Sequence, residues 1–88
     1  MIEATLEVKN RLGLHLRAAS ALAQSLIQFN STVTLSDGRQ EINARSVTSL
    51  ITLGAAQGTR LKVKAEGPDA HATMAAIKSL FESRFGED

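Results

Sequence analysis

The pattern of apolar and polar residues changes its period several times along the chain. Residues 2–8 alternate strictly, which is typical of a strand with one buried face. From Leu16 the apolar positions recur at three- and four-residue steps instead, which predicts an amphipathic helix that ends at Asn30-Ser31. Residues 32–36 alternate again and predict a second strand.

Turn and capping residues divide the middle of the chain. Asp37-Gly38 predicts a two-residue hairpin loop of type I′, which needs a positive φ at both positions, with a third strand over residues 40–43 pairing back. Ser46 is expected to cap a short helix over residues 47–53, since its hydroxyl can accept from the free amides of the first turn, and Gly54 is expected to end that helix.

The last third of the chain predicts one more strand and one more helix. Residues 61–66 alternate again, and Asp69 is a good capping residue for a final helix with Met74, Ile77 and Phe81 on one face. The order is β-α-β-β-α-β-α. Four one-sided strands and three amphipathic helices predict an α+β fold, a two-layer open-faced sandwich. In it a four-stranded antiparallel-type sheet is covered on one face by the three helices, in a single domain over residues 1–88.

Composition narrows the class of protein. Hydrophobic residues make up 43% of the chain, which is enough for one core in a domain of 88 residues. There is no Cys, so disulfides, thiol chemistry and zinc fingers are excluded. No apolar run reaches the ~18 residues of a membrane span, and the N-terminus does not resemble a secretion signal. We therefore expect a cytoplasmic protein that does not bind membranes.

Charge and aromatic content argue against nucleic-acid binding. The net charge is +1, with the excess of basic residues before residue 65 and the excess of acidic residues after it. The chain has no Trp or Tyr and three Phe, so platforms for stacking bases are scarce. We expect no nucleic-acid partner, no cofactor and no metal. No long unmatched apolar face is evident, so a monomer is expected.

His15 is the candidate for chemistry, because it stands where the first helix begins. The free amides of Leu16, Arg17 and Ala18 should point toward its side chain. The helix dipole adds about half a positive charge there, and Arg17 adds a full one. These charges favour a neutral, nucleophilic imidazole at pH 7, and the same groups would receive a phosphoryl group attached to it. A polar helix cap near an arginine remains the other interpretation. His71, on the last helix, is assigned no role.

The segment around His15 and several others resemble one protein family. The first reads Asn10-Arg11-Leu12-Gly13-Leu14-His15-Leu16-Arg17-Ala18-Ala19. It resembles the active-site segment of the histidine-containing phosphocarrier HPr of bacterial phosphotransferase systems, which typically reads Gly-Leu/Ile/Met-His-Ala-Arg-Pro-Ala/Ser. The resemblance spans the whole chain, continuing through residues 28–31, 43–47, 53–54, 57–58 and 65–69. The ending, residues 80–88, looks more like the nitrogen-related branch of the family than the sugar branch.

The resemblance implies a phosphoryl carrier rather than a free-standing enzyme. In that family His15 would accept phosphate, on Nδ1, from phosphorylated enzyme I and pass it to an enzyme IIA domain. Arg17 would steady the phosphoryl group, with the backbone amides of Leu16 and Arg17. The partners would dock on an exposed apolar rim formed by Leu14, Leu16, Val47, Leu50 and Ile51.

Two residues depart from the family pattern. Ala18 replaces the usual Pro and Leu16 replaces the usual small residue. Pro presets φ early in a helix, so Ala18 loosens the first turn slightly. Both changes are expected to affect the choice of partner more than the transfer chemistry.

Ser46 is a possible regulatory site. In many family members the matching Ser is phosphorylated by a dedicated kinase, and a kinase/phosphorylase is therefore a possible partner. Arg45 precedes it here and could pair with a phosphate, which is also favoured at a helix start. The following residues depart from those of the regulated members, and a plain helix cap is the alternative.

Three other functions compete with the carrier. An acylphosphatase-like enzyme would need a Gly-rich anion loop, which the chain lacks. A small-ligand regulatory domain would fit the same fold without needing His15. A regulatory HPr-like protein, which signals without feeding sugar transport, is the main alternative.

Overall fold

The computed structural model describes residues 1–87, and its strands form one antiparallel sheet in the order β1-β4-β2-β3. The elements, in chain order, are β1 Ile2–Glu7, α1 Leu16–Ser25, β2 Thr32–Ser36, β3 Glu41–Asn43, α2 Val47–Leu53, β4 Arg60–Glu66, α3 Ala70–Glu82 and a 3₁₀ turn, η1, Arg84–Gly86. The central strand β4 pairs with both β1 and β2, and Val63 lies between Ala4 and Leu35. The predicted order of elements and the fold class are confirmed.

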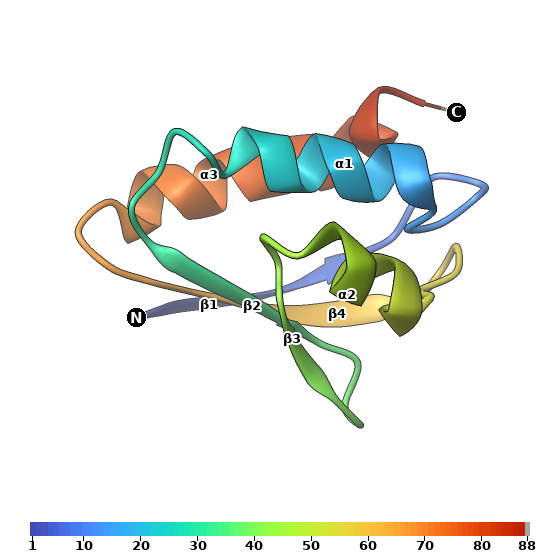
Figure 1. The fold of residues 1–88 in the computed structure, drawn as a ribbon, viewed down its shortest axis with the longest axis horizontal. Helices are drawn as coiled ribbons and strands as arrows, with labels where there is room; N and C mark the ends of the chain where they lie inside the picture. The colour runs from blue at the N-terminus through green and yellow to red at the C-terminus, as the bar shows by residue number, and fades with distance from the viewer. Residues whose placement is uncertain (88) are drawn as a thin grey trace.

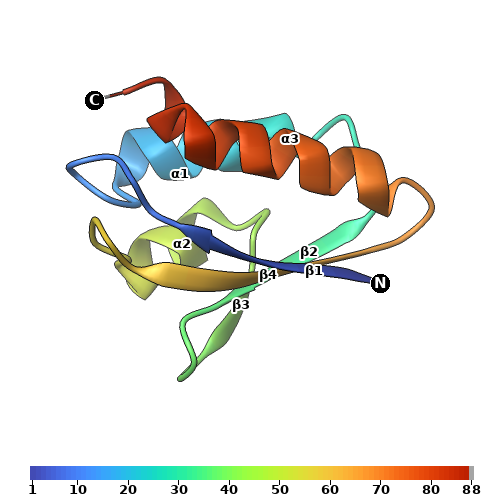
Figure 2. The same ribbon diagram turned by 180° about the vertical axis from the view of Figure 1, so that it is seen from behind.

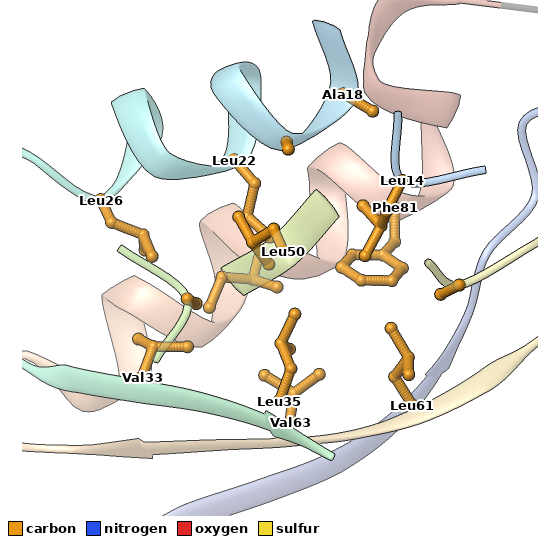
Figure 3. Packing of buried hydrophobic residues seen from close by; sticks show 14 of the residues in the cluster. Leu14, Ala18, Leu22, Leu26, Val33, Leu35, Leu50, Leu61, Val63 and Phe81 are labelled. Carbon is orange, nitrogen blue, oxygen red and sulfur yellow. The ribbon is translucent and has the colours of Figure 1, made fainter. Parts of the chain in front are cut away.

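The helices cover one face of this sheet (Figures 1 and 2). Helices α1 and α3 lie side by side over it, and the short helix α2 lies beside α1. Apolar side chains from both layers meet between them (Figure 3), including Leu22, Leu50 and Phe81 from the helices and Leu35 and Val63 from the sheet. The alternation of the strands follows from this arrangement, because every second residue faces the helices.

Three local predictions were wrong: the type of loop between β2 and β3, the end of α1 and the side-chain cap of α3. The loop between β2 and β3 holds four residues, and only Gly38 of the Asp37-Gly38 pair has a positive φ. The Asp37 carboxylate accepts from the amides of Arg39 and Gln40 and so shapes a longer loop than the type I′ turn.

The first and last helices also differ from the prediction at their ends. Helix α1 ends at Ser25, several residues early, although Leu26 remains buried. Asp69 stands at the N-cap position of α3, but its carboxylate makes no capping bond to the helix. It accepts from the Thr73 hydroxyl within α3 and, outside the helix, from Ser31 Oγ and the amide of Asn30, which ties α3 to the chain that follows α1.

The chain turns back after α3, a feature that the apolar pattern did not predict. Arg84, Phe85 and Gly86 all have φ between 57° and 79°, so three successive residues adopt the left-handed conformation. The Phe85 ring is buried and lies 4.9 Å from that of Phe81, centroid to centroid. This turn directs Glu87 toward the beginning of α1. Over residues 1–87, no helix combines the length and the apolar character that a membrane crossing requires.

Candidate functional site

His15 occupies the N-cap position of α1, as predicted. Its backbone is extended, with φ −80° and ψ −177°, and its Nδ1 accepts a hydrogen bond from the amide of Arg17 at 3.3 Å. The side chain is about a quarter exposed, at 28%. The imidazole therefore sits at the positive end of the helix with Nδ1 among free backbone donors, where an attached anion is favoured.

Hydrogen bonds from Asn10 and to Ala55 hold the loop that leads to His15. Asn10 is fully buried, and its Nδ2 donates to the carbonyl of Gly13 at 2.7 Å. The amide of Leu14 donates to the carbonyl of Ala55, which follows α2. Gly13 has φ +69°, and a Cβ there would lie 2.3 Å from that same carbonyl oxygen. Only glycine fits at this crossing, so the position of His15 depends on close contact between two loops.

Glu87 is a member of the site that the sequence analysis missed. Its Oε1 lies 2.8 Å from His15 Nε2 and also accepts from Asn10 Nδ2 at 3.2 Å. Its Oε2 lies 3.9 Å from Nη1 of Arg17. An isolated apolar residue after the last helix, Phe85, followed by Gly86, was the signal in the sequence that the chain turns back here.

Glu87 changes the electrostatic description of the site. The sequence suggested an entirely positive neighbourhood for His15, but a carboxylate stands on the Nε2 side of the ring. The hydrogen bond with His15 is the main reason that the pKa of Glu87 lies below its ordinary value, and it outweighs the opposing effect of burial. The ring is therefore polarised, with an acceptor at Nε2 and backbone donors at Nδ1.

The side chain of Arg17 is 82% exposed, and its guanidinium lies 3.9 Å from Glu87 Oε2. Two shallow hollows lie beside it. One is lined by Arg11, Leu12, Arg17, Gly86 and Glu87, and the other by Leu12, His15, Leu16, Arg17 and Ser20. Arg17 contributes to both hollows, so it can approach an anion bound on His15 without a change in the backbone.

The predicted apolar rim needs correction. Leu16 and Ile51 are exposed, at 63% and 42%, and Val47 is partly exposed. Leu14 and Leu50 are buried and belong to the core (Figure 3), because each faces the space between the helices and the sheet. The sequence analysis missed two exposed apolar residues, Leu12 and Ile27. Alternation and helical spacing do not assign a face to residues in a loop or at the end of a helix.

Ser46 lies at the N-cap of α2, and its Oγ accepts from the amide of Ser49 at 3.2 Å, as the capping prediction required. Arg45 is not available to a phosphate there. Its guanidinium donates to three backbone carbonyls beyond the end of α1, those of Leu26, Phe29 and Ser31, at 2.7–2.9 Å. The expected pairing of Arg45 with a phosphorylated Ser46 would require these bonds to break.

The other histidine and the acidic residues of the described chain are the candidates for a metal site. His71 is exposed on α3. Within residues 1–87, no three His, Cys, Asp or Glu side chains gather in a way that could hold a metal ion.

Comparison with known proteins assigns the arrangement around His15 to a family. A family model described as the phosphorylation site of the PTS HPr component matches residues 2–83. The chain belongs to the HPr family of phosphocarriers. The resemblance noted in the sequence is thereby confirmed, and so is phosphoryl carriage as the function of the family.

Relatives of the chain come from both branches of the HPr family. The phosphocarrier protein HPr of Xylella fastidiosa strain Temecula1 is 46% identical over 88 residues, covering 100% of this chain and 99% of that protein. The phosphocarrier protein NPr of Escherichia coli K12 is 38% identical and covers 99% of this chain and 98% of that protein. The nitrogen-related character of the ending therefore stays a prediction, and Asp88 lies outside the described residues.

Solved HPr structures have the same fold. The crystal structure of HPr-C-His from Thermoanaerobacter tengcongensis superposes with a TM-score of 0.94 at 38% identity, covering 100% of this chain and 99% of that chain. The open-faced sandwich and its helix order are thus those of the HPr family.

Proposed function

We propose that His15 carries the phosphoryl group, accepting it from phosphorylated enzyme I and passing it to an enzyme IIA domain. The observation that carries this assignment is the position of Nδ1 at the N-terminus of α1, with the amide of Arg17 directed at it. Nε2 is engaged by Glu87 at 2.8 Å, whereas Nδ1 accepts only the longer bond from the Arg17 amide at 3.3 Å, so we expect Nδ1 to give up that bond and react. The exchange would take place in the cytoplasm, between monomers of the carrier and their partners.

The neighbouring groups suit a transferable phosphate. Its charge would meet the amides of Leu16 and Arg17, and the Arg17 guanidinium would approach from the exposed side. Ala18 lies within the first turn of α1 and is buried, and the helix forms from Leu16 without the proline that is usual in the family. The helical first turn supports the expectation that transfer survives the replacement of the usual proline by Ala18.

The proposed docking surface consists of Leu12, Leu16, Ile27, Val47 and Ile51, which are exposed or partly exposed. Leu12 and Leu16 flank His15, and the others extend the surface along α1 and α2. Exposed apolar side chains near a reactive group are typical of an interaction site, and a carrier needs contacts weak enough to release each partner. Helix α2 carries no charged residue, so the partner is expected to present an apolar face.

A single mass measurement tests the carrier function. The protein is incubated with enzyme I and phosphoenolpyruvate, beside His15→Ala and, as a matched control, His71→Ala. We expect one acid-labile phosphate on the wild type and on His71→Ala, and none on His15→Ala. An unmodified wild-type mass with active enzyme I would contradict the proposal.

The second candidate is a regulatory carrier that does not feed sugar transport. The 38% identity to a phosphocarrier named NPr favours it, together with Leu16 in place of a small residue. Measuring sugar uptake after deletion of the gene separates the two. A direct loss of uptake would exclude the purely regulatory version.

A further inference from the structure

We propose that Glu87 is a positioning residue for phosphoryl transfer: it holds the Nε2–H of His15 and stabilises the positive charge that the ring gains when Nδ1 attacks phosphorus. This inference rests on the proposed function and deepens it. Glu87 lies beyond residue 83, where the match to the family model ends.

The contacts place one carboxylate oxygen between two donors. Oε1 of Glu87 lies 2.8 Å from His15 Nε2 and 3.2 Å from Asn10 Nδ2, which also holds the carbonyl of Gly13. The side chain of Glu87 is only 14% exposed. Asn10 therefore holds both the carboxylate and the loop before His15. The ring is held at Nε2 by Glu87 and at Nδ1 by the Arg17 amide.

The backbone of the C-terminal turn keeps Glu87 in this place. Arg84 and Phe85 have φ of 58° and 57°, a conformation that residues with a side chain seldom adopt. Such a conformation persists only where the surroundings hold it, and here the buried Phe85 ring lies against Phe81. The packing of Phe85 against Phe81 thus holds the turn, and Glu87, which follows it, reaches His15.

The transfer step balances without a further reactant. The lone pair of Nδ1 forms the bond to phosphorus, while the bond between phosphorus and the phosphorylated donor protein breaks and its electron pair stays with the donor. The ring keeps its proton on Nε2 and becomes cationic, and the Glu87 carboxylate stabilises that charge across a short hydrogen bond. When the group leaves for an acceptor, the same events run in reverse.

Glu87 meets this charge from the side of the ring opposite to the phosphoryl group. Its pKa is held below the ordinary value, mainly by His15, so it is ionised at neutral pH. Arg17 lies 3.9 Å from Glu87 Oε2 and is highly exposed, so it can exchange the carboxylate for phosphoryl oxygens. The positive charge of the nearby guanidinium then reduces the repulsion between Glu87 and the phosphoryl group.

The test compares Glu87→Ala and Glu87→Gln with the wild type. The matched control is Glu82→Gln, since Glu82 is also a paired acid near the C-terminus but contacts Lys9 instead of His15. The first readout is the ¹⁵N NMR spectrum of the unphosphorylated protein. We expect a hydrogen-bonded, downfield Nε2–H of His15 in the wild type and the control, weakened in Glu87→Gln and absent in Glu87→Ala.

The second readout is the rate of phosphorylation by enzyme I. We expect kcat to fall on the order of 10-fold in Glu87→Ala, with KM for the carrier unchanged and partial rescue in Glu87→Gln, which keeps the acceptor without the charge. Wild-type rates in Glu87→Ala, or an unchanged Nε2–H signal, would overturn the role of Glu87 alone. A wild-type protein that takes up no phosphate would overturn the carrier function as well, and the two failures are therefore distinguishable.

Discussion

The beginnings of α1 and α2 have the same construction and different surroundings. Each helix starts with a side chain that accepts a hydrogen bond from the first turn, His15 in α1 and Ser46 in α2. Each also has an arginine within two residues of the cap. In α1 the guanidinium of Arg17 is exposed to solvent, whereas in α2 that of Arg45 is bonded to three carbonyls.

This difference supports the proposal that the beginning of α1 receives a phosphoryl group and that of α2 does not. A helix N-terminus offers free amides at either place, but an incoming phosphate also needs a cation whose hydrogen bonds are not already committed. The guanidinium of Arg45 already donates to three carbonyls that follow α1, so it has no free position for a phosphate. An arginine next to a helix cap can therefore bind a phosphate there only if its guanidinium is not already hydrogen-bonded elsewhere.

The largest expected effect comes from Gly13→Ala, which disturbs the contact between the loop before α1 and the loop after α2. A Cβ at this position would lie 2.3 Å from the Ala55 carbonyl oxygen, in a backbone with φ +69°. We expect a loss of about 3 kcal/mol in the free energy of unfolding, from strain and the displaced loop. Urea unfolding measures it.

The matched control for Gly13→Ala is Gly38→Ala, which also has a positive φ but meets no atom within 4 Å. A loss of about 1 kcal/mol is expected there. Equal losses in the two variants would show that the contact with Ala55 is unimportant.

Replacing each of the two arginines in turn gives the next largest effect. Arg45→Ala removes hydrogen bonds to three carbonyls and should cost about 2 kcal/mol of stability, with the rate of phosphorylation nearly unchanged. Arg17→Ala should change stability by less than about 0.5 kcal/mol while slowing phosphorylation. Thermal unfolding and transfer kinetics on both variants check this, and a parallel change in both properties would refute the division of labour.

Removing the cap of α2 has a smaller effect. Ser46→Ala should cost about 1 kcal/mol, because the amide of Ser49 loses its acceptor, and Ser46→Asp should restore most of it. Stability of the two variants by urea unfolding provides the comparison.

Modification of Ser46 stays a separate prediction. Incubation with a Ser kinase and ATP, followed by intact mass, tests it directly. An unmodified mass would leave Ser46 as a structural cap only.

The smallest expected effect is the pH dependence of the stability that the Glu87 carboxylate contributes at the beginning of α1. The pKa of Glu87 is lower in the folded protein than its ordinary value of 4.5, chiefly through the hydrogen bond with His15. Such a group contributes stability above its unfolded pKa and loses it as the pH falls through the folded value. The stability advantage of wild type over Glu87→Gln should therefore be complete at neutral pH and shrink below pH 4.5.

Urea unfolding at successive pH values measures this change. Asp37 and Asp69 also have lowered pKa values, so both proteins lose stability in acid, and only their difference reports Glu87. A difference that does not depend on pH would argue against the hydrogen bond.

The fold could be predicted because it rests on periodicity. The alternation in residues 2–8 and the capping signals at Ser46 and Gly54 are local features, and the structure has a strand over Ile2–Glu7 and a helix over Val47–Leu53 that ends at a left-handed Gly54. The position of His15 as a cap was predictable for the same reason, since the helical pattern begins directly after it.

The rest of the site depends on contacts between distant parts of the chain. The Glu87–His15 bond joins residues that are 72 positions apart, and it exists because Phe85 turns the chain back. Leu14 seemed available to partners because the pattern has no period in a loop, yet it is buried. From the sequence, Arg45 is expected to pair with a phosphate on Ser46, whereas its guanidinium bonds to carbonyls up to 19 residues away.

The bend after α3 has a practical consequence for anyone who purifies or labels the protein. A tag or fluorophore attached after this turn would lie near Glu87, whose carboxylate is 2.8 Å from His15 Nε2. Strand β1 begins on the side of the molecule opposite to the turn that follows α3 (Figures 1 and 2), and Met1 is exposed. Affinity handles and immobilisation chemistry therefore belong at the N-terminus, where a bulky attachment stays away from the surface around His15.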